Sequence, residues 1–372
     1  MYPINRIPRI TPRMAFTVFQ VAICAAFVAP AIAQDAPLLK ILGQFTAPDV
    51  PAQGPAESSS APRTWMDPTT NPSAVSPNLP GNGLAQHPML YAGEGYNTLF
   101  LVNNGKVIWS YTSSRGGEID DIWMLTNGHI LYSRMSFIEE VSPQKKVVWH
   151  FDAPNGTEIH TCQPIGLDKV LFVENGLPPK AIIMNKMTGA VEMEHALPAI
   201  STDDPKTVHP QFRRFRMTKD GTFMAAHLNM NKVVEYDKDF KEIWSYNIGL
   251  PWSAVRLKNG NTLIDGEKDR VVREVNPKGE TVWEFKQSDF PAGVVQHNNQ
   301  TADRLANGNT IICSSTSGAK GVDIIKTAQV VEIAPDKKVV WALQDWKNLG
   351  PATTVQLLDE PGIPENPGDL QR

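Results

Sequence analysis

Cysteine is scarce in this chain, with only three in 372 residues. Cys24 lies in an N-terminal segment that we expect to be removed from the mature protein. The two others, Cys162 and Cys313, are far apart in the sequence and form no CxxC pair. A disulfide framework or a cysteine-ligated zinc site is therefore not expected.

Excess positive charge is also missing. The net charge is -4 at pH 7, and the isoelectric point is near 6.1. Binding to nucleic acid depends on clustered Lys and Arg side chains that contact phosphates. We therefore predict that nucleic acid is not a partner. The 41% of hydrophobic and 20% of charged residues are typical of a globular protein with a sizeable core.

Long hydrophobic runs are absent except for one near the N-terminus, over residues 14–28. Three arginines precede it (Arg6, Arg9 and Arg13), and Ala31-Ile32-Ala33 follows it. This pattern predicts a cleaved secretory signal over residues 1–33 and a periplasmic or extracellular protein. The alternative is a membrane anchor, which Pro30 and the shortness of the run disfavour, because a spanning helix needs about 20 apolar residues. After cleavage we expect no integral membrane segment.

Residues 34–86 are rich in Pro, Ser, Ala and Asn and show little periodic hydrophobicity. They predict a linker or a strap on the surface. From His87 onward the chain repeats itself. The first repeated mark is an Asn-Gly turn followed by an apolar run, as in residues 127–132, 259–264 and 307–312, with weaker copies at 167–172 and 220–224. Asn-Gly supplies the positive φ that a tight hairpin needs.

The second mark combines a Pro-containing turn with a strand that carries Trp, and it recurs at residues 140–151, 274–285 and 332–341. The series runs Trp109, Trp149, Met193, Trp244, Trp283 and Trp341, with spacings of 39 to 58 residues. We expect these tryptophans in the core. Such spacing predicts an all-β fold, a six-bladed β-propeller of four-stranded antiparallel blades over residues 87–360.

The first of these repeats lacks its innermost strand. The segment from Ala352 to Leu357 has the alternation of an inner strand, as in residues 253–257. Its pairing with the first blade would close the ring and remove an exposed edge. We therefore predict that strands from both ends of the propeller form one blade, and that residues 361–372 are a tail.

Over residues 87–360 the two marks resemble the arylsulfotransferase-like and quinoprotein (PQQ)-like β-propeller superfamily. That resemblance implies the fold more than an activity. Quinone-dependent members often carry an adjacent cysteine pair, which this chain lacks. Arylsulfotransferases carry a separate N-terminal β-rich domain, which residues 34–86 are too short to supply, and their full set of histidines is not matched.

Equivalent positions of the inner strands place three arginines one residue before the last apolar residue of the strand, namely Arg216, Arg256 and Arg304. If the three guanidinium groups point to the channel axis, they suit a sulfate, phosphate or uronate. The alternative is that each pairs with an acid such as Asp303 or Asp265, or covers apolar surface.

Three histidines lie at blade entrances, where the loops of a propeller ring one mouth of its channel. His209 and His297 precede their apolar anchors by eight residues, and His160 by five. Each suits nucleophilic or acid/base chemistry, with His297 as the first choice for a catalytic residue. A structural, hydrogen-bonded histidine is the alternative for each.

Other polar residues near these entrances complete the expected ligand site. They are Asp120, Gln163, Gln211, Arg213, Arg214, Trp252, Asn298 and Gln300. Trp252 suits stacking on a sugar or aryl ring, or packing between blades. Residues 314–326 form an insertion that suits a lid beside His297.

Three functions follow as hypotheses. The first is an exported propeller that binds a small anionic or carbohydrate ligand at the channel mouth. The second is group transfer like that of arylsulfotransferases, through a channel histidine, and the third is a carbohydrate lyase or hydrolase. The sequence predicts no metal site and identifies no cofactor.

Overall fold

The computed structural model describes residues 36–45, 78–94, 96–114, 117–314, 322–346 and 348–372. Of the two compact units of the chain, residues 1–31 and 32–372, the described residues belong to the second. The predicted signal, residues 1–33, and most of the insertion at 314–326 lie outside the described residues. Within them, no helix is long and apolar enough to cross a membrane.

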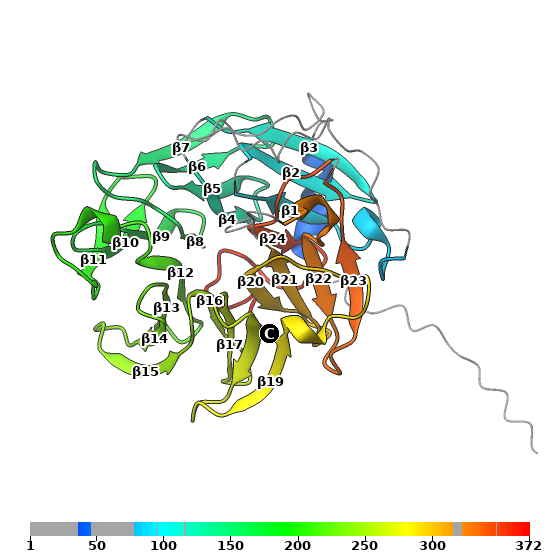
Figure 1. Cartoon of the computed structure of the whole chain (residues 1–372). Helices are drawn as coiled ribbons and strands as arrows, with labels where there is room; N and C mark the ends of the chain where they lie inside the picture. Colours follow the sequence, from blue (N-terminus) through cyan, green and yellow to red (C-terminus); the bar gives the residue numbers. More distant parts are fainter. Residues whose placement is uncertain (1–35, 46–77, 95, 115–116, 315–321, 347) are drawn as a thin grey trace, which may run out of the picture. The chain divides into compact units, whose positions relative to one another are not determined.

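Six four-stranded antiparallel sheets form the blades of a β-propeller, as the repeats predict. The innermost strands surround the centre of the ring and the outermost strands lie at its periphery (Figure 1). Blade 1 consists, from the channel outwards, of β24 (Thr354–Leu357), β1 (Met89–Ala92), β2 (Thr98–Asn103) and β3 (Lys106–Thr112). Blade 2 consists of β4 (Ile119–Met124), β5 (Ile130–Arg134), β6 (Phe137–Val141) and β7 (Val147–Asp152). Blade 3 consists of β8 (Cys162–Ile165), β9 (Lys169–Glu174), β10 (Lys180–Asn185) and β11 (Val191–Ala196).

The other three blades follow the same order. Blade 4 consists of β12 (Phe212–Met217), β13 (Phe223–His227), β14 (Lys232–Tyr236) and β15 (Glu242–Asn247). Blade 5 consists of β16 (Pro251–Arg256), β17 (Thr262–Gly266), β18 (Val271–Val275) and β19 (Thr281–Lys286). Blade 6 consists of β20 (Asn299–Arg304), β21 (Thr310–Ser314), β22 (Val330–Ile333) and β23 (Val339–Leu343). Short 3₁₀ helices are η2 (Pro37–Gln44), η4 (Gly83–Ala85), η5 (Pro205–Thr207), η6 (Gln287–Asp289) and η7 (Ile324–Lys326).

The ring closes through the strand expected from the C-terminal segment. β24 pairs antiparallel with β1, with Met89 opposite Leu357 and Tyr91 opposite Val355. It begins at Thr354, two residues later than the predicted Ala352. The Tyr91 hydroxyl also donates to the carbonyl of Gly350, which ties the chain that precedes β24 to blade 1.

The turns and tryptophans that mark the repeat have distinct physical roles. Gly128, Gly260 and Gly308 have φ of 86°, 87° and 87°, as the Asn-Gly turns require. The indole of Trp109 donates to the carbonyl of Pro143 in the next blade, at 2.9 Å. The same bond joins Trp244 to Pro277 and Trp283 to Pro335, so each joins adjacent blades.

The expectation that all these tryptophans are core residues is wrong for three of them. Trp109 and Trp341 are fully buried, whereas Trp149, Trp244 and Trp283 are only partly buried. The reason is that outer strands have one face in solvent, as the alternating exposure of β7, β15 and β19 shows. A tryptophan there covers the joint between two blades and remains partly exposed.

The described parts of the segment 34–86 lie against the ring. Leu38 and Leu42 of η2 are buried in the apolar cluster shared by blades 1 and 2. At the other side of blade 1, the carbonyl of Pro80 accepts from the backbone N–H of Ala342, and that of Gly83 accepts from the Trp341 indole. These contacts attach the two described parts of the segment to blades 1, 2 and 6.

A charged cluster supports the ring closure. His87, just before β1, bonds to Asp359 after β24 (2.8 Å) and to Glu332 of blade 6 (3.1 Å). Burial lowers the pKa of His87, but the hydrogen bonds and charges of these two carboxylates outweigh burial and raise it to about 9. His87 is therefore protonated at neutral pH and joins the two ends of the ring to the last blade.

We predict that deletion of residues 349–372 abolishes cooperative unfolding, because β1 then has an unpaired edge towards the channel. A finer test is Leu357→Ala, which should cost about 2–5 kcal/mol of stability because Leu357 is buried between blades. The matched control is Val282→Ala on the outer strand β19, where the exposed side chain should change stability by about 0.5 kcal/mol or less. Denaturant titration followed by circular dichroism measures both. Equal effects of the two substitutions would contradict the closure.

We predict that the His87 cluster loses its contribution in alkali. Since the folded pKa is raised above the ordinary 6.5, the stabilisation is fully present below pH 6.5 and is lost as the pH rises through 9. Wild type should therefore lose up to about 3 kcal/mol more than His87→Gln between pH 6 and pH 9.5. The control is His150→Gln. His150 also forms ion pairs with two acids, but it is more exposed, so its removal should change the pH dependence of stability much less. Parallel pH profiles for wild type and His87→Gln would count against this role.

Candidate functional site

The predicted histidines and arginines lie at opposite ends of the inner strands. His297 precedes β20, whose last residue is Arg304, and His209 precedes β12, which ends just after Arg216. At about 3.3 Å per residue, the five steps from Asn299 to Arg304 span about 17 Å. The single mouth expected to hold both sets is therefore two separate regions, the entrance end and the exit end of the inner strands.

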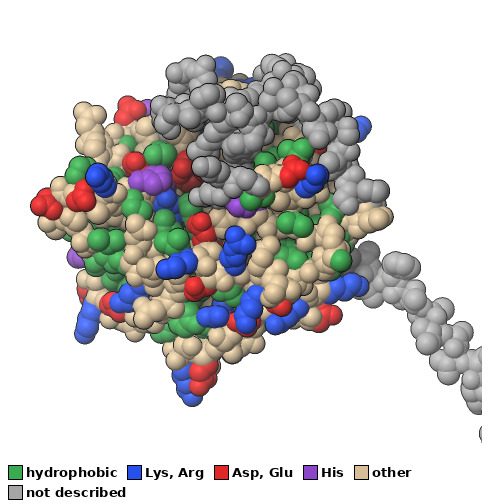
Figure 2. All heavy atoms as spheres, viewed as in Figure 1, with side chains coloured by type: hydrophobic (Ala, Val, Ile, Leu, Met, Phe, Trp, Pro, Cys, Tyr) green, Lys and Arg blue, Asp and Glu red, His purple; other side chains and the backbone are tan. Residues whose placement is uncertain are grey.

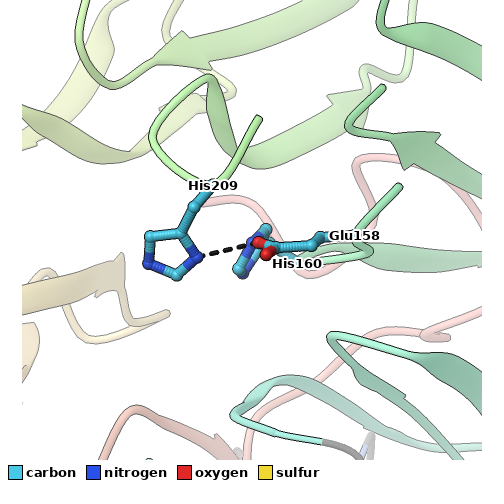
Figure 3. A group of neighbouring side chains, drawn as sticks. All are labelled: Glu158, His160 and His209. Atoms are coloured by element: carbon cyan, nitrogen blue, oxygen red, sulfur yellow. Dashed lines mark hydrogen bonds and ion pairs between the residues drawn. The ribbon is translucent and has the colours of Figure 1, made fainter. Parts of the chain in front are cut away.

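A compact histidine and carboxylate group occupies the entrance end. His160 and Glu158 lie on the chain that enters β8, and His209 on the chain that enters β12. His160 Nδ1 is 2.6 Å from Asp120 Oδ2, and its Nε2 is 2.9 Å from Glu158 Oε2. The same Glu158 oxygen lies 2.8 Å from His209 Nδ1 (Figure 3). Two imidazoles from different blades are thus joined through one carboxylate.

This group continues into blades 5 and 6. Arg213 Nη2 lies 3.3 Å from His209 Nε2, and the guanidinium stacks 4.4 Å from the centre of the Trp252 ring. The Trp252 indole donates to Glu267, whose other oxygen accepts from Asn298 Nδ2 at 2.8 Å. We call the whole series from blade 2 to blade 6 the entrance belt. It comprises Asp120, Glu158, His160, His209, Arg213, Trp252, Glu267 and Asn298.

Burial and hydrogen bonding set the charges in the belt. Burial and the Arg213 charge lower the pKa of His160, but hydrogen bonds to Asp120 and Glu158 outweigh them and raise it. Burial raises the pKa of Glu158, but hydrogen bonds from the two histidines outweigh burial and lower the pKa to about 2. Burial and the charge of Asp120 raise the pKa of the neighbouring Glu118. These pKa shifts favour the protonated form of His160 and the ionised form of Glu158.

Solvent reaches few side chains of this group. His209 is 45% exposed, Glu158 24% and Glu118 18%, whereas His160 and Asp120 are buried. Trp252 is only 7% exposed, and Arg213 covers its ring. The expected stacking of a sugar on Trp252 is therefore not supported, because its place is taken by a guanidinium. The visible face of the molecule mixes acidic, basic and histidine side chains (Figure 2).

Two arginines of β12 fill the channel between its ends. Arg214 donates to Thr354 of β24 at 2.6 Å, which connects blade 4 to the closing strand. Arg216 forms a bidentate pair with Asp121 of blade 2, both contacts at 2.8 Å. Burial lowers the pKa of Arg216, which the Asp121 charge opposes. Both guanidinium groups are therefore used within the fold.

The other two arginines of the predicted anion site join adjacent blades. Arg256 pairs with Glu235 of blade 4 and lies 5.0 Å from the ring centre of Trp244. Arg304 pairs with Glu274 of blade 5 at 2.7 Å and lies 5.2 Å from that of Trp283. Each is neutralised by an acid from the preceding blade. The three equivalent arginines thus follow the alternative of individual ion pairs, although with other acids than those expected.

A cavity of about 100 Å³ lies at the exit end and is lined by Arg214, Arg216, Arg304, Asp121 and Asp303 together with residues of the C-terminal tail. The tail is held by Glu365, which accepts from the N–H and hydroxyl of Thr126 at 2.6 and 2.8 Å. The Glu365 carbonyl accepts from Gly166 N at 2.9 Å. Glu360 also lines the cavity, so that three acids face three arginines and the cavity is not a basic pocket.

The remaining predicted site residues, three glutamines and His297, lie outside the entrance belt. The side chain of Gln163 bonds to both backbone groups of Met217, and that of Gln211 donates to the carbonyl of Gly176. Gln300 is buried, and neither of its side-chain polar atoms has a partner in the described part of the chain. His297 lies at the entrance to blade 6, and the group of side chains within 4.8 Å around Glu158 contains His160 and His209 but not His297.

Sequence reasoning missed two acids that organise the entrance belt. Glu158 bridges the two histidines, and Glu267 joins Trp252 to Asn298. The spacing of Glu158 and His160 was a usable signal, because residues i and i+2 of an extended segment share one face. Glu267 had no comparable signal, since it follows β17 and meets its partners only across blades.

Comparisons with known proteins show similarity in fold alone. No family model matches the sequence, and no curated protein matches it. A crystal structure of a protein of unknown function from Bacteroides caccae is similar with a TM-score of 0.63 and 24% identity, over 72% of this chain and 98% of that one. Virginiamycin B lyase from Staphylococcus aureus gives a TM-score of 0.49 and 11% identity, over 71% of this chain and 87% of that one. The first similarity extends to the fold alone, and neither carries an activity or arylsulfotransferase-like character to this chain.

Proposed function

We propose that this protein is an exported β-propeller that binds a small ligand with an anionic group, such as a sugar carboxylate, at the entrance belt. The observation that carries the proposal is the pair formed by Arg213 and His209. Arg213 is fixed by the carbonyl of His209 and by Trp252, and its Nε is buried with no partner in the described residues. His209 reaches solvent beside it.

The chemistry of this pair suits a carboxylate. A guanidinium offers parallel donors to an anion, and the partly exposed imidazole of His209 lies beside it. Glu158 and Asn298 are placed nearby in the belt, where they suit the hydroxyl groups of a sugar. The arginines of the channel and of the exit end are less suitable, because each is already paired with an acid or with Thr354.

The proposed export rests on the N-terminal pattern of residues 1–33 in the sequence. The two enzymatic hypotheses, group transfer through a channel histidine and carbohydrate lysis or hydrolysis, remain predictions. Of their expected histidines, His160 and His209 share one group, and His297 stays a separate candidate.

We predict that glucuronate or galacturonate binds the full chain and that Arg213→Gln weakens this binding by about tenfold to one-hundredfold, the equivalent of one charge-assisted hydrogen bond. Glucose and galactose should bind more weakly, since they lack the carboxylate. Isothermal titration at two salt concentrations measures these affinities. The matched control is Arg256→Gln, since Arg256 also stacks on a tryptophan but pairs with an acid and lies at the exit end.

Unchanged affinity in Arg213→Gln would contradict the proposal, as would equal losses in the two arginine variants, which would indicate a general charge effect. Thermal melting of both variants checks that each is folded. Absence of binding to either uronate in wild type would overturn the choice of ligand class.

A further inference from the structure

We propose that Glu118, Asp120 and His160 bind one divalent metal ion at the entrance end of blades 2 and 3. This site goes beyond the proposed anion binding, which relies on Arg213 and His209. The three side chains each offer one ligand atom, and these atoms lie within 4.8 Å of one another. Glu118 directly precedes β4, Asp120 lies at the start of β4, and His160 lies on the chain that enters β8, the inner strand of the next blade.

The distances between the ligand atoms are close to those around a metal. His160 Nδ1 lies 2.6 Å from Asp120 Oδ2 and 3.9 Å from Glu118 Oε2. With metal–ligand bonds of about 2.0–2.2 Å, neighbouring ligand atoms are about 3.0–3.4 Å apart. Binding therefore requires Asp120 to move away by about half an ångström and Glu118 to move closer by a similar amount. Both shifts are within the reach of side-chain rotation.

Two carboxylate oxygens at this place lack partners. Asp120 Oδ1 and Glu118 Oε2 are buried and form no hydrogen bond within the described residues. The Asp120 side chain is only 4% exposed, so water does not replace the missing donor at its surface. A buried carboxylate without full hydrogen bonding is costly. A cation bound by Glu118 Oε2 and by both oxygens of Asp120 would satisfy these atoms and relieve the repulsion between the two carboxylates.

The surroundings of His160 match those of a metal-binding histidine. Such a histidine donates its second ring N–H to a carboxylate, which fixes the ring and leaves the other nitrogen free for the metal. His160 Nε2 lies 2.9 Å from Glu158, so that Nδ1 is the nitrogen available to the metal. Glu158 is held in turn by His209. Glu158 and His209 therefore position His160 without binding the metal themselves.

A second group of possible ligands, Glu158, His160 and His209, is less suitable. Coordination through His209 Nδ1 would place the remaining proton on its Nε2, which lies 3.3 Å from Arg213 Nη2. Two donors would then face each other. A metal ion bound by His209 would also lie near the positive charge of Arg213, which would repel it. The acid pair of blade 2 has no such conflict.

The set of ligands indicates the class of metal. Two carboxylates balance the charge of a divalent ion, and one imidazole nitrogen favours a first-row transition metal over Ca²⁺. Mn²⁺ accepts such a mixture of oxygen and nitrogen, and water can complete its coordination. Glu118 is 18% exposed and provides a route from solvent.

The test is Mn²⁺ binding to the full chain, after dialysis against chelator, measured by electron paramagnetic resonance of the free ion. We expect one Mn²⁺ per chain, a rise in melting temperature, and affinity at least about tenfold lower in Glu118→Gln and Asp120→Asn. The matched control is Asp152→Asn. Asp152 also bonds to a histidine, His150 at 2.9 Å, but it is 83% exposed and not part of either three-ligand group.

Three results would overturn the proposal. They are no binding of Mn²⁺ or Zn²⁺ by wild type at submillimolar concentrations, unchanged affinity in Glu118→Gln, and an equal loss in Asp152→Asn. Because Glu118 is partly exposed and Gln has its shape, Glu118→Gln should fold even if Asp120→Asn does not. Uronate titration of the metal-free protein separates the two proposals, since the anion site contains neither acid.

Discussion

Pairing of β24 with β1 is the constraint on which the other features of the structure depend. An open ring would leave a sheet edge with unpaired backbone groups, and the blades on both sides of the gap would lose apolar contacts. The closing strand also brings Thr354 into the channel, where it accepts from Arg214 of blade 4. His87 also connects the two strands of this pairing to blade 6, through its bonds to Asp359 and Glu332. Both ends of the channel therefore keep their shape only while the ring is closed.

Buried charges divide the channel into two chemically different ends. Removing a guanidinium and a carboxylate from water is costly, and the cost is offset only with good geometry and further hydrogen bonds. Arg216 and Asp121 meet this condition through two contacts of 2.8 Å. The arginines are thereby committed to the fold. The entrance end instead combines imidazoles, carboxylates and one guanidinium, some of which reach solvent.

The entrance belt shows how a propeller assembles a site from distant parts of the chain. Five blades contribute one or two side chains each, and rigid inner strands hold the loops in place. Glu158 has a central position, because it bonds to His160 on the proposed metal side and to His209 on the proposed anion side. One carboxylate thus orients both imidazoles, and the two proposed sites are neighbours without sharing a ligand.

The sequence predicts the six blades, their strand order and the closing strand. These follow from local signals, since Asn-Gly turns need positive φ and the Trp and Pro marks recur because each bond joins consecutive blades. It also placed His160 and His209 at one mouth. The contacts of Arg216, Arg256 and Arg304, in contrast, depend on the tertiary structure. Their partners lie in other blades, 21 to 95 residues away in the sequence. A repeat position shows which residues are equivalent, but the acid that each one meets depends on how the blades are arranged around the channel.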